Sequence, residues 1–268
     1  MKSHTLFLLG ISLFIISCKD TKKEETTTNT ENQETASTDK STEKPISDLK
    51  IIPITHATAV LEYKEKTIYI DPTGGAKAFK NQKLPDIVLI TDIHGDHMNI
   101  ETLDSLDLEK SKLVVPQAVA ERLPARYTKQ LVIINNGEVK DVEGISIEAI
   151  PMYNLREEAL KFHDKGRGNG YVITLGNERL YFSGDTEDIP EMRALKNIDK
   201  AFVCMNLPYT MTVESAADAV LEFKPKQVYP YHYRGSNGLS NIIKFRETVN
   251  KGDSKIEVVQ LNWYPTIK

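Results

Sequence analysis

From about residue 49 onward, the chain carries short apolar runs separated by polar turns. The run Ile87-Val88-Leu89-Ile90 is continuously apolar, which is typical of a strand buried on both faces. Segments 59–63 and 67–71 are rich in β-branched and aromatic residues, and Lys64-Glu65-Lys66 between them predicts a hairpin turn. By the same criteria we predict further strands at 50–55, 112–115, 131–134, 148–150, 170–175, 179–182, 201–205, 227–231 and 257–262.

The spacing of apolar residues becomes helical between several of these strands. Helices are predicted near 100–106, 117–123, 190–196 and 213–223. Two layers of strands with helices outside them indicate an α/β protein, arranged as a four-layer αββα sandwich. The segment 49–268, about 220 residues, is long enough for one domain with a substantial core.

The first 18 residues follow a different pattern. A basic start precedes an apolar run, 6–16, that is too short to span a bilayer comfortably, so we predict a secretory signal. The ending Ile15-Ile16-Ser17-Cys18 resembles a bacterial lipobox, in which cleavage occurs before the cysteine and the thiol carries lipid. Residues 1–18 are therefore predicted to be a lipoprotein signal peptide. The alternatives are an ordinary signal peptide with an incidental cysteine, or an uncleaved anchor.

Residues 19–48 consist mainly of Thr, Glu, Lys, Ser, Asn and Asp, and contain no aromatic residue. Such a segment cannot bury enough apolar surface to offset its ordering entropy, which predicts a disordered polar tether. With a lipidated Cys18, this tether would hold the domain to a membrane in the bacterial cell envelope, on the exported side.

Charge and cysteine content exclude two classes of protein. The formal net charge of −4 argues against a nucleic-acid-binding protein with a broad basic face. The chain has 2 cysteines, Cys18 and Cys204, so a disulfide framework is excluded. Nothing in the sequence indicates the oligomeric state.

Immediately after the predicted strand 87–90, the chain contains residues whose side chains can bind a metal. Asp92, His94, Asp96 and His97 lie within one short turn, and alternate residues of an extended segment share a face. The alternative is an ordinary solvated polar turn. Three further candidates, His163, Asp185 and His232, lie near other predicted strand ends, so one pocket could collect imidazole and carboxylate groups that suit zinc or a similar ion.

The loop Thr91-Asp92-Ile93-His94-Gly95-Asp96-His97 resembles the signature loop of the metallo-β-lactamase superfamily, T-H-x-H-x-D-H, with Asp92 in place of the first His. Other stretches that resemble the family follow in the family's order, from about residue 49 to the C-terminus: His56-Ala57-Thr58, Tyr69-Ile70-Asp71-Pro72, Phe182-Ser183-Gly184-Asp185-Thr186 and Tyr229-Pro230-Tyr231-His232. The branch that looks most similar contains compact hydrolases resembling ascorbate-phosphate lactonase.

The resemblance implies a centre for two divalent metal ions. One ion would take Asp92 and His94, and the other Asp96, His97 and His232, with Asp185 bridging them. For Asp92 the alternative is an outer acid that orients a neighbouring histidine. Segment 149–154 offers no His where relatives usually have one, so His163 is the available third ligand of the first ion. A loop histidine that faces the substrate is the alternative for His163.

Zinc is the expected metal, although the hard oxygen of Asp92 could favour manganese or iron, or leave a single-metal enzyme. Asp96 and Asp185 are the predicted catalytic residues, with Asp96 orienting the water and accepting its proton. His56 and Asp71 are predicted to hold the ligands from outside, with local hydrogen bonding at strand ends as the alternative.

These features predict a membrane-tethered metal-dependent hydrolase with a small-molecule substrate. A metal-bound hydroxide would attack an ester, lactone, amide or phosphodiester bond. Asn154, Arg167 and Tyr231 are the predicted substrate-binding residues, and an anionic substrate is favoured because Arg suits oxyanions. The alternative from another class is a non-catalytic metal-binding or scaffold lipoprotein.

Overall fold

The computed structural model describes residues 48–265. The predicted signal peptide 1–18, its lipobox Cys18, and the tether predicted at 19–48 apart from its last residue lie outside the described residues. Within residues 48–265, none of the helices combines the length and apolar character needed to cross a bilayer.

The first large sheet of the described region has six strands in the order β1-β2-β3-β4-β5-β6. Neighbours from β1 to β3 pair antiparallel, and neighbours from β3 to β6 pair parallel. The strands are β1 (Leu49–Thr55), β2 (Thr58–Tyr63), β3 (Lys66–Ile70), β4 (Ile87–Leu89), β5 (Lys112–Val115) and β6 (Leu131–Ile133).

The second large sheet of this region has seven strands in the order β15-β12-β11-β10-β9-β8-β7. Its β7-to-β10 half is antiparallel, whereas β10, β11, β12 and β15 run parallel. The strands are β7 (Val139–Val142), β8 (Ile145–Met152), β9 (Gly168–Leu175), β10 (Glu178–Phe182), β11 (Lys200–Val203), β12 (Gln227–Pro230) and β15 (Glu257–Val258). A small ribbon pairs β13 (Arg234–Gly235) with β14 (Gly238–Leu239).

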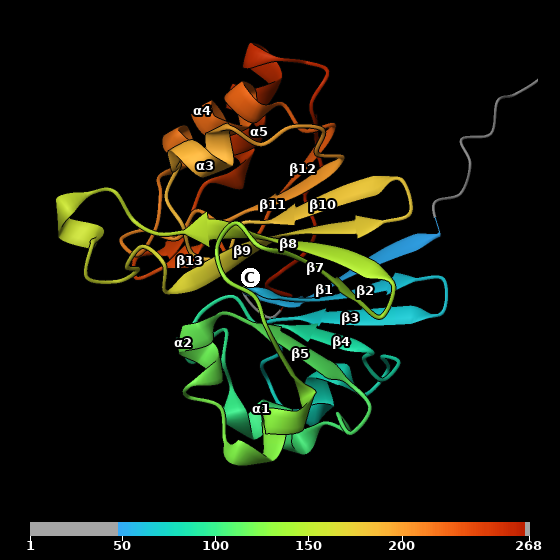
Figure 1. The fold of residues 1–268 in the computed structure, drawn as a ribbon. Coiled ribbons are helices and arrows are strands. Elements are labelled where there is room, and N and C mark those ends of the chain that lie inside the picture. Colours follow the sequence, from blue (N-terminus) through green and yellow to red (C-terminus); the bar gives the residue numbers. More distant parts are fainter. Residues whose placement is uncertain (1–47, 266–268) are drawn as a thin grey trace, which may run out of the picture. The chain divides into compact units, whose positions relative to one another are not determined.

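Helices cover the outer face of each sheet (Figure 1). On the first sheet lie η1 (Ala76–Phe79), α1 (Ile100–Ser105), α2 (Gln117–Ala120) and η2 (Ala125–Gln130). On the second sheet lie α3 (Pro190–Arg193), α4 (Val213–Phe223) and α5 (Ile242–Gly252). The short η3 (Glu157–Ala159) belongs to the loop between β8 and β9.

Strand β4 shows why its sequence is continuously apolar. Ile87 and Leu89 point into the core between the sheets, whereas Val88 and Ile90 pack in the layer under α1 and α2. Both faces of the strand are therefore covered, as the apolar run predicts. The predicted αββα sandwich is confirmed.

The sequence-based prediction missed helix α5 and strand β7, and also the short elements η1, η2, η3, β13 and β14. Helix α5 has Ile242, Phe245 and Val249 at helical spacing, behind an Asn241 side chain that accepts a hydrogen bond from the Lys244 amide, 2.9 Å. That signal was available in the sequence. Strand β7 exposes most of its side chains and so carries no apolar pattern that would have revealed it.

The topology places the candidate residues at one edge of both sheets. Asp71 follows β3, the loop 91–97 follows β4, Asp185 follows β10 and His232 follows β12. These four strands run parallel to a neighbour within their sheets. The carboxyl ends of parallel strands commonly form binding crevices in α/β proteins, and here the two sheets supply such ends together.

Candidate metal centre

The loop after β4 turns back on itself immediately before α1. The amides of His97 and Met98 both donate to the carbonyl of His94, at 3.0 and 2.7 Å. Asp92 and His97 are fully buried by this turn, whereas the side chains of His94 and Asp96 keep 41% and 46% of their exposure. The loop therefore presents buried and accessible metal-binding groups side by side.

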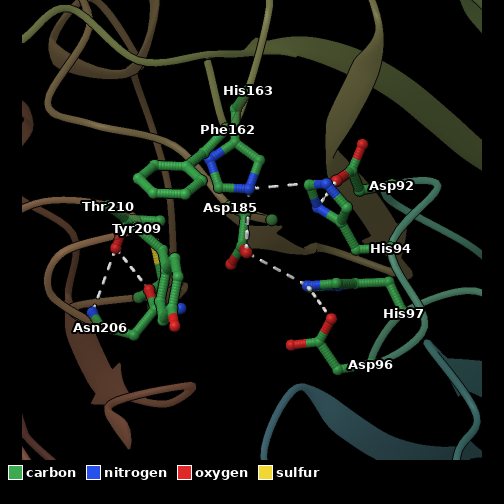
Figure 2. Close-up of polar contacts among 12 residues, drawn as sticks. Asp92, His94, Asp96, His97, Phe162, His163, Asp185, Asn206, Tyr209 and Thr210 are labelled. Carbon is green, nitrogen blue, oxygen red and sulfur yellow. Dashed lines mark hydrogen bonds and ion pairs between the residues drawn. The ribbon is translucent and has the colours of Figure 1, made fainter. Parts of the chain in front are cut away.

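Asp185 lies at the middle of the centre (Figure 2). Its Oδ2 is 3.2 Å from His163 Nε2 and 3.3 Å from His97 Nε2. Its Oδ1 is 3.1 Å from His232 Nε2. One buried carboxylate thus contacts imidazoles from three separate loops, which is the arrangement that a bridging ligand requires.

The described residues contain three groups whose donor atoms lie within 4.8 Å of one another. They are Asp92-His94-His163, His97-Asp185-His232 and His56-Asp96-His232. All seven predicted ligands fall into these groups, and so does His56, which the sequence placed outside the ligand set. The donors are imidazole nitrogens and carboxylate oxygens, a set that fits a divalent metal such as zinc. Their individual roles as ligands stay predictions.

The first group is organised around Asp92. Its Oδ2 is 2.6 Å from His94 Nδ1 and 4.0 Å from His163 Nε2. Arg167 donates to the same carboxylate from Nε to Oδ1 and from Nη2 to Oδ2, both at 3.1 Å. Asp92 therefore faces two imidazoles with one oxygen while a guanidinium binds both oxygens.

Asp71 holds His97 from behind. Its Oδ2 is 2.8 Å from His97 Nδ1, and its two oxygens accept from the amide and the hydroxyl of Thr91 at 2.8 and 2.7 Å. A proton on Nδ1 leaves the lone pair of a neutral His97 on Nε2, which faces Asp185. Asp71 therefore lies where an outer residue was expected.

His56 reaches the centre from the end of β1. Its Nε2 is 3.2 Å from Asp96 Oδ2, and its Nδ1 is 2.8 Å from the hydroxyl of Tyr264. The ring also lies 3.9 Å, between centroids, from that of His232. These contacts fit the predicted role of holding Asp96, and they leave a direct role as a ligand open.

Three of these residues have left-handed backbone. His56, Asp71 and His232 have φ of 54°, 43° and 45°. Such conformations are costly for residues with a Cβ and tend to gather at functional sites. The backbone thus supports a function for this cluster independently of the side chains.

Burial and neighbouring charges set the protonation of the centre. Burial opposes ionisation of Asp185, yet the imidazoles of His232, His97 and His163 hold its pKa well below the usual value. Burial lowers the pKa of His232 to about 3, against the opposing effect of Asp185. An ionised Asp185 and a neutral His232, which are the forms that bind metal, therefore face each other near neutral pH. Burial opposes the charged form of His97, but Asp185, Asp71 and Asp96 still raise its pKa well above the usual value, so metal binding there would displace a proton.

A pocket of about 340 Å³ opens onto the centre. Its lining consists of His94, Asp96, Phe162, His163, Asp185, Asn206 and Tyr209. The rings of Phe162 and Tyr209 meet edge to face at 5.1 Å and give the pocket an apolar wall (Figure 2). Neither Phe162 nor Asn206 was predicted, because the chain carries no local signal that distinguishes them from other loop residues.

The three predicted substrate-binding residues are absent from this lining. Asn154 is buried, and its amide donates to the carbonyls of Ala159 and Tyr209 at 2.8 and 2.7 Å. Tyr231 is also buried and accepts from the Gly184 amide at 2.9 Å. Arg167 binds Asp92. Their positions favour holding the surrounding loops, and direct contact with a substrate stays a prediction without support from this geometry.

Comparison with known proteins gives consistent matches. A family model described as "Beta-lactamase superfamily domain" matches residues 50–232. A UPF0173 metal-dependent hydrolase of Thermococcus onnurineus is 32% identical over 179 residues, covering 63% of this chain and 77% of the relative. A protein from Parabacteroides distasonis described as a metal-dependent hydrolase has a crystal structure with a TM-score of 0.72 and 34% identity, covering 81% and 94% of the two chains. The metallo hydrolase Igni18 of Ignicoccus hospitalis, at 22% identity and a TM-score of 0.67, covers 80% of this chain and 94% of its own and shares the fold.

Proposed function

The chain belongs to the beta-lactamase superfamily and is a metal-dependent hydrolase. From this premise we propose that it cleaves a small-molecule ester, lactone or amide. The observation that carries the proposal is Asp185, whose two oxygens contact three imidazoles. Asp185 and His163 of this cluster line a pocket of suitable size for a small molecule. The lactone follows from the resemblance to ascorbate-phosphate lactonase.

We propose that two divalent ions are held there, with zinc as the expected metal and manganese or iron as alternatives. The first would be held by Asp92, His94 and His163, and the second by Asp96, His97 and His232, with Asp185 between them. Bound ions would supply Lewis acidity and lower the pKa of a water at the centre toward neutrality.

Asp96 is the side chain best placed to handle the proton of that water. It lines the pocket and stays partly exposed, so a water can reach it. Burial opposes its ionisation, but the charge of His97 and the hydrogen bond from His56 hold its pKa below the usual value. An ionised carboxylate in this position can orient a water and accept a hydrogen bond from it.

The pocket wall favours an uncharged group on the substrate. Phe162 and Tyr209 offer apolar surface, whereas Arg167, Arg156 and Lys165 bind Asp92, Glu187 and Glu191. Among the described residues, those that line the pocket include no Lys or Arg that could bind the anionic substrate expected from the sequence. Lys161 Nζ lies 5.1 Å from the centroid of the Phe162 ring but is not part of that lining. We therefore place uncharged esters, lactones and amides ahead of phosphodiesters.

Chelation tests the requirement for metal. Dialysis of the protein against a chelator should remove hydrolysis of whichever substrate in a panel of esters, lactones, amides, β-lactams and phosphodiesters is turned over, because the donor set of the centre suits a divalent ion. Adding Zn²⁺ or Mn²⁺ back should restore it. Turnover that survives chelation, with metal loss verified by elemental analysis, contradicts the proposal. A metal-loaded protein that hydrolyses no member of the panel supports the non-catalytic alternative.

We further propose that Cys18 is lipidated and that residues 19–48 tether the domain to a membrane, on the exported side of the cell envelope. The support is the basic and apolar pattern of the first 18 residues and the polar composition that follows. Mass spectrometry of the mature N-terminus should find Cys18 as the first residue, carrying acyl chains. An unmodified Cys18 in a soluble secreted product would contradict the anchor.

A further inference from the structure

A guanidinium lies against one half of the metal centre. Arg167 comes from the turn before β9, and Asp92 lies 75 positions earlier, after β4. Asp92 is completely buried, and the side chain of Arg167 is 16% exposed. The fork of Arg167 binds both carboxylate oxygens, and its Nη2 also donates to the carbonyl of Phe162. A buried, bidentate pair of this kind has a fixed geometry.

The other half of the centre has no such cation. Within residues 48–265, the ion-pair partners of Asp185 and Asp96 are imidazoles, with neither Lys nor Arg among them. Two carboxylates without a guanidinium thus surround His97 and His232.

The difference in charge bears directly on cation binding. Around His94 and His163, the positive charge of Arg167 offsets the negative charge of Asp92. When both histidines are neutral, the formal charges of Asp92, His94, His163 and Arg167 therefore add up to zero. Asp185 contacts His163 as well as His97 and His232, so its negative charge is common to both halves. Around His97 and His232, Asp96 adds a further negative charge that no Lys or Arg of residues 48–265 offsets, under the same assumption. Because Coulomb interactions over a few ångströms in a buried site are strong, a dication gains much more from the second arrangement.

We propose that Arg167 is a resident cation that makes the two halves of the centre unequal, so that a divalent ion binds tightly among Asp96, His97, Asp185 and His232 and a second ion binds weakly among Asp92, His94 and His163. The proposal rests on the proposed function, because it assumes that both groups bind metal. It gives Arg167 a part in metal affinity, in place of the contact with substrate that the sequence suggested.

Titration of the metal-depleted full-length protein with Mn²⁺ tests the proposal without any substrate. Free Mn²⁺ is followed by its electron paramagnetic resonance signal, and heat by calorimetry. The wild-type protein should show one tight and one weak step, separated by at least about 10-fold. Arg167→Met should tighten the weak step by about 10-fold and leave the tight step unchanged. Asp92→Asn should remove the weak step.

Two further variants separate charge from geometry. Arg167→Lys keeps the positive charge and should keep the weak step weak. Lys165→Met removes a nearby cation that binds Glu191 instead, and should leave both steps as in the wild type. A second comparison sets the single variant Asp92→His against the double variant that carries both Asp92→His and Arg167→Met. Neither of these proteins contains the Asp92 carboxylate, so removing Arg167 does not leave a buried carboxylate without a partner. Loss of Arg167 in that background should strengthen the weak step by about 10-fold.

The titrations distinguish failure of the proposal on Arg167 from failure of the proposed hydrolase centre. Two equal steps in the wild type, or a weak step that Arg167→Met leaves unchanged or abolishes in protein shown to be folded by circular dichroism, overturn the proposal. In the abolished case Arg167 merely positions Asp92. If Arg167→Met does not fold, the comparison in the Asp92→His background gives the same decision. Absence of any bound ion in the wild type would instead defeat the proposed hydrolase centre.

Discussion

Replacing Asp185 by asparagine should lower hydrolytic turnover by at least about 100-fold while the domain stays folded. Asp185 contacts His97, His163 and His232 at once, so both of the proposed ions would lie beside it. The amide keeps the shape of the carboxylate, but it removes the negative charge and turns one oxygen into a donor. Turnover with the best substrate of the panel and the circular dichroism spectrum measure the two parts of the prediction.

Asp199→Asn is the matched control for this variant. Asp199 is a partly buried carboxylate that binds Lys226 and the amide of Arg179 and lies outside the lining of the pocket. Its variant should retain turnover close to that of the wild type. Normal turnover in Asp185→Asn, or equal losses in both variants, would count against Asp185 as the centre of the site.

Asp71→Ala should lower the free energy of unfolding by about 3–5 kcal/mol and weaken metal binding by about 10- to 100-fold. The carboxylate is completely buried and accepts from the amide and the hydroxyl of Thr91, while its Oδ2 also lies 2.8 Å from His97 Nδ1. Alanine leaves these groups without a partner and frees the ring of His97 to turn. Urea unfolding and Mn²⁺ titration give the two quantities.

Asp71→Asn separates the two effects. It keeps the volume and one acceptor oxygen, so it should unfold closer to the wild type than Asp71→Ala, yet still bind metal less tightly because the negative charge behind His97 is lost. A wild-type midpoint and wild-type metal affinity in Asp71→Ala would show that His97 needs no partner on Nδ1.

The fold was predictable because the pattern of apolar residues in most strands and helices reflects which of their faces are buried. A strand covered on both faces, such as β4, must be apolar throughout, and an amphipathic helix such as α4 must repeat at helical spacing. Strand β7 escaped prediction because most of its side chains are exposed and its pairing with β8 rests on backbone hydrogen bonds. Composition alone gives little information about such an edge strand.

The convergence of the site was predictable for a related reason, because its residues follow strands that end at one edge. Contacts between side chains of different loops could not be predicted from the sequence. The pairing of Arg167 with Asp92 depends on how two loops 75 residues apart fold against each other. The wall of Phe162 and Tyr209 depends in turn on the Asn154 amide, which donates to the carbonyls of Ala159 and Tyr209.

The left-handed backbone of His56, Asp71 and His232 limits how this protein can be made more robust. Glycine adopts such a φ without the penalty of about 1–2 kcal/mol that a side chain incurs, so the backbone by itself would favour glycine at all three positions, although the amide and hydroxyl of Thr91 would then lose Asp71 as their acceptor. Each exchange would also delete an imidazole or carboxylate of the centre. The domain thus retains costly backbone conformations at its candidate metal centre. Engineering for higher thermal stability should therefore leave these three positions unchanged.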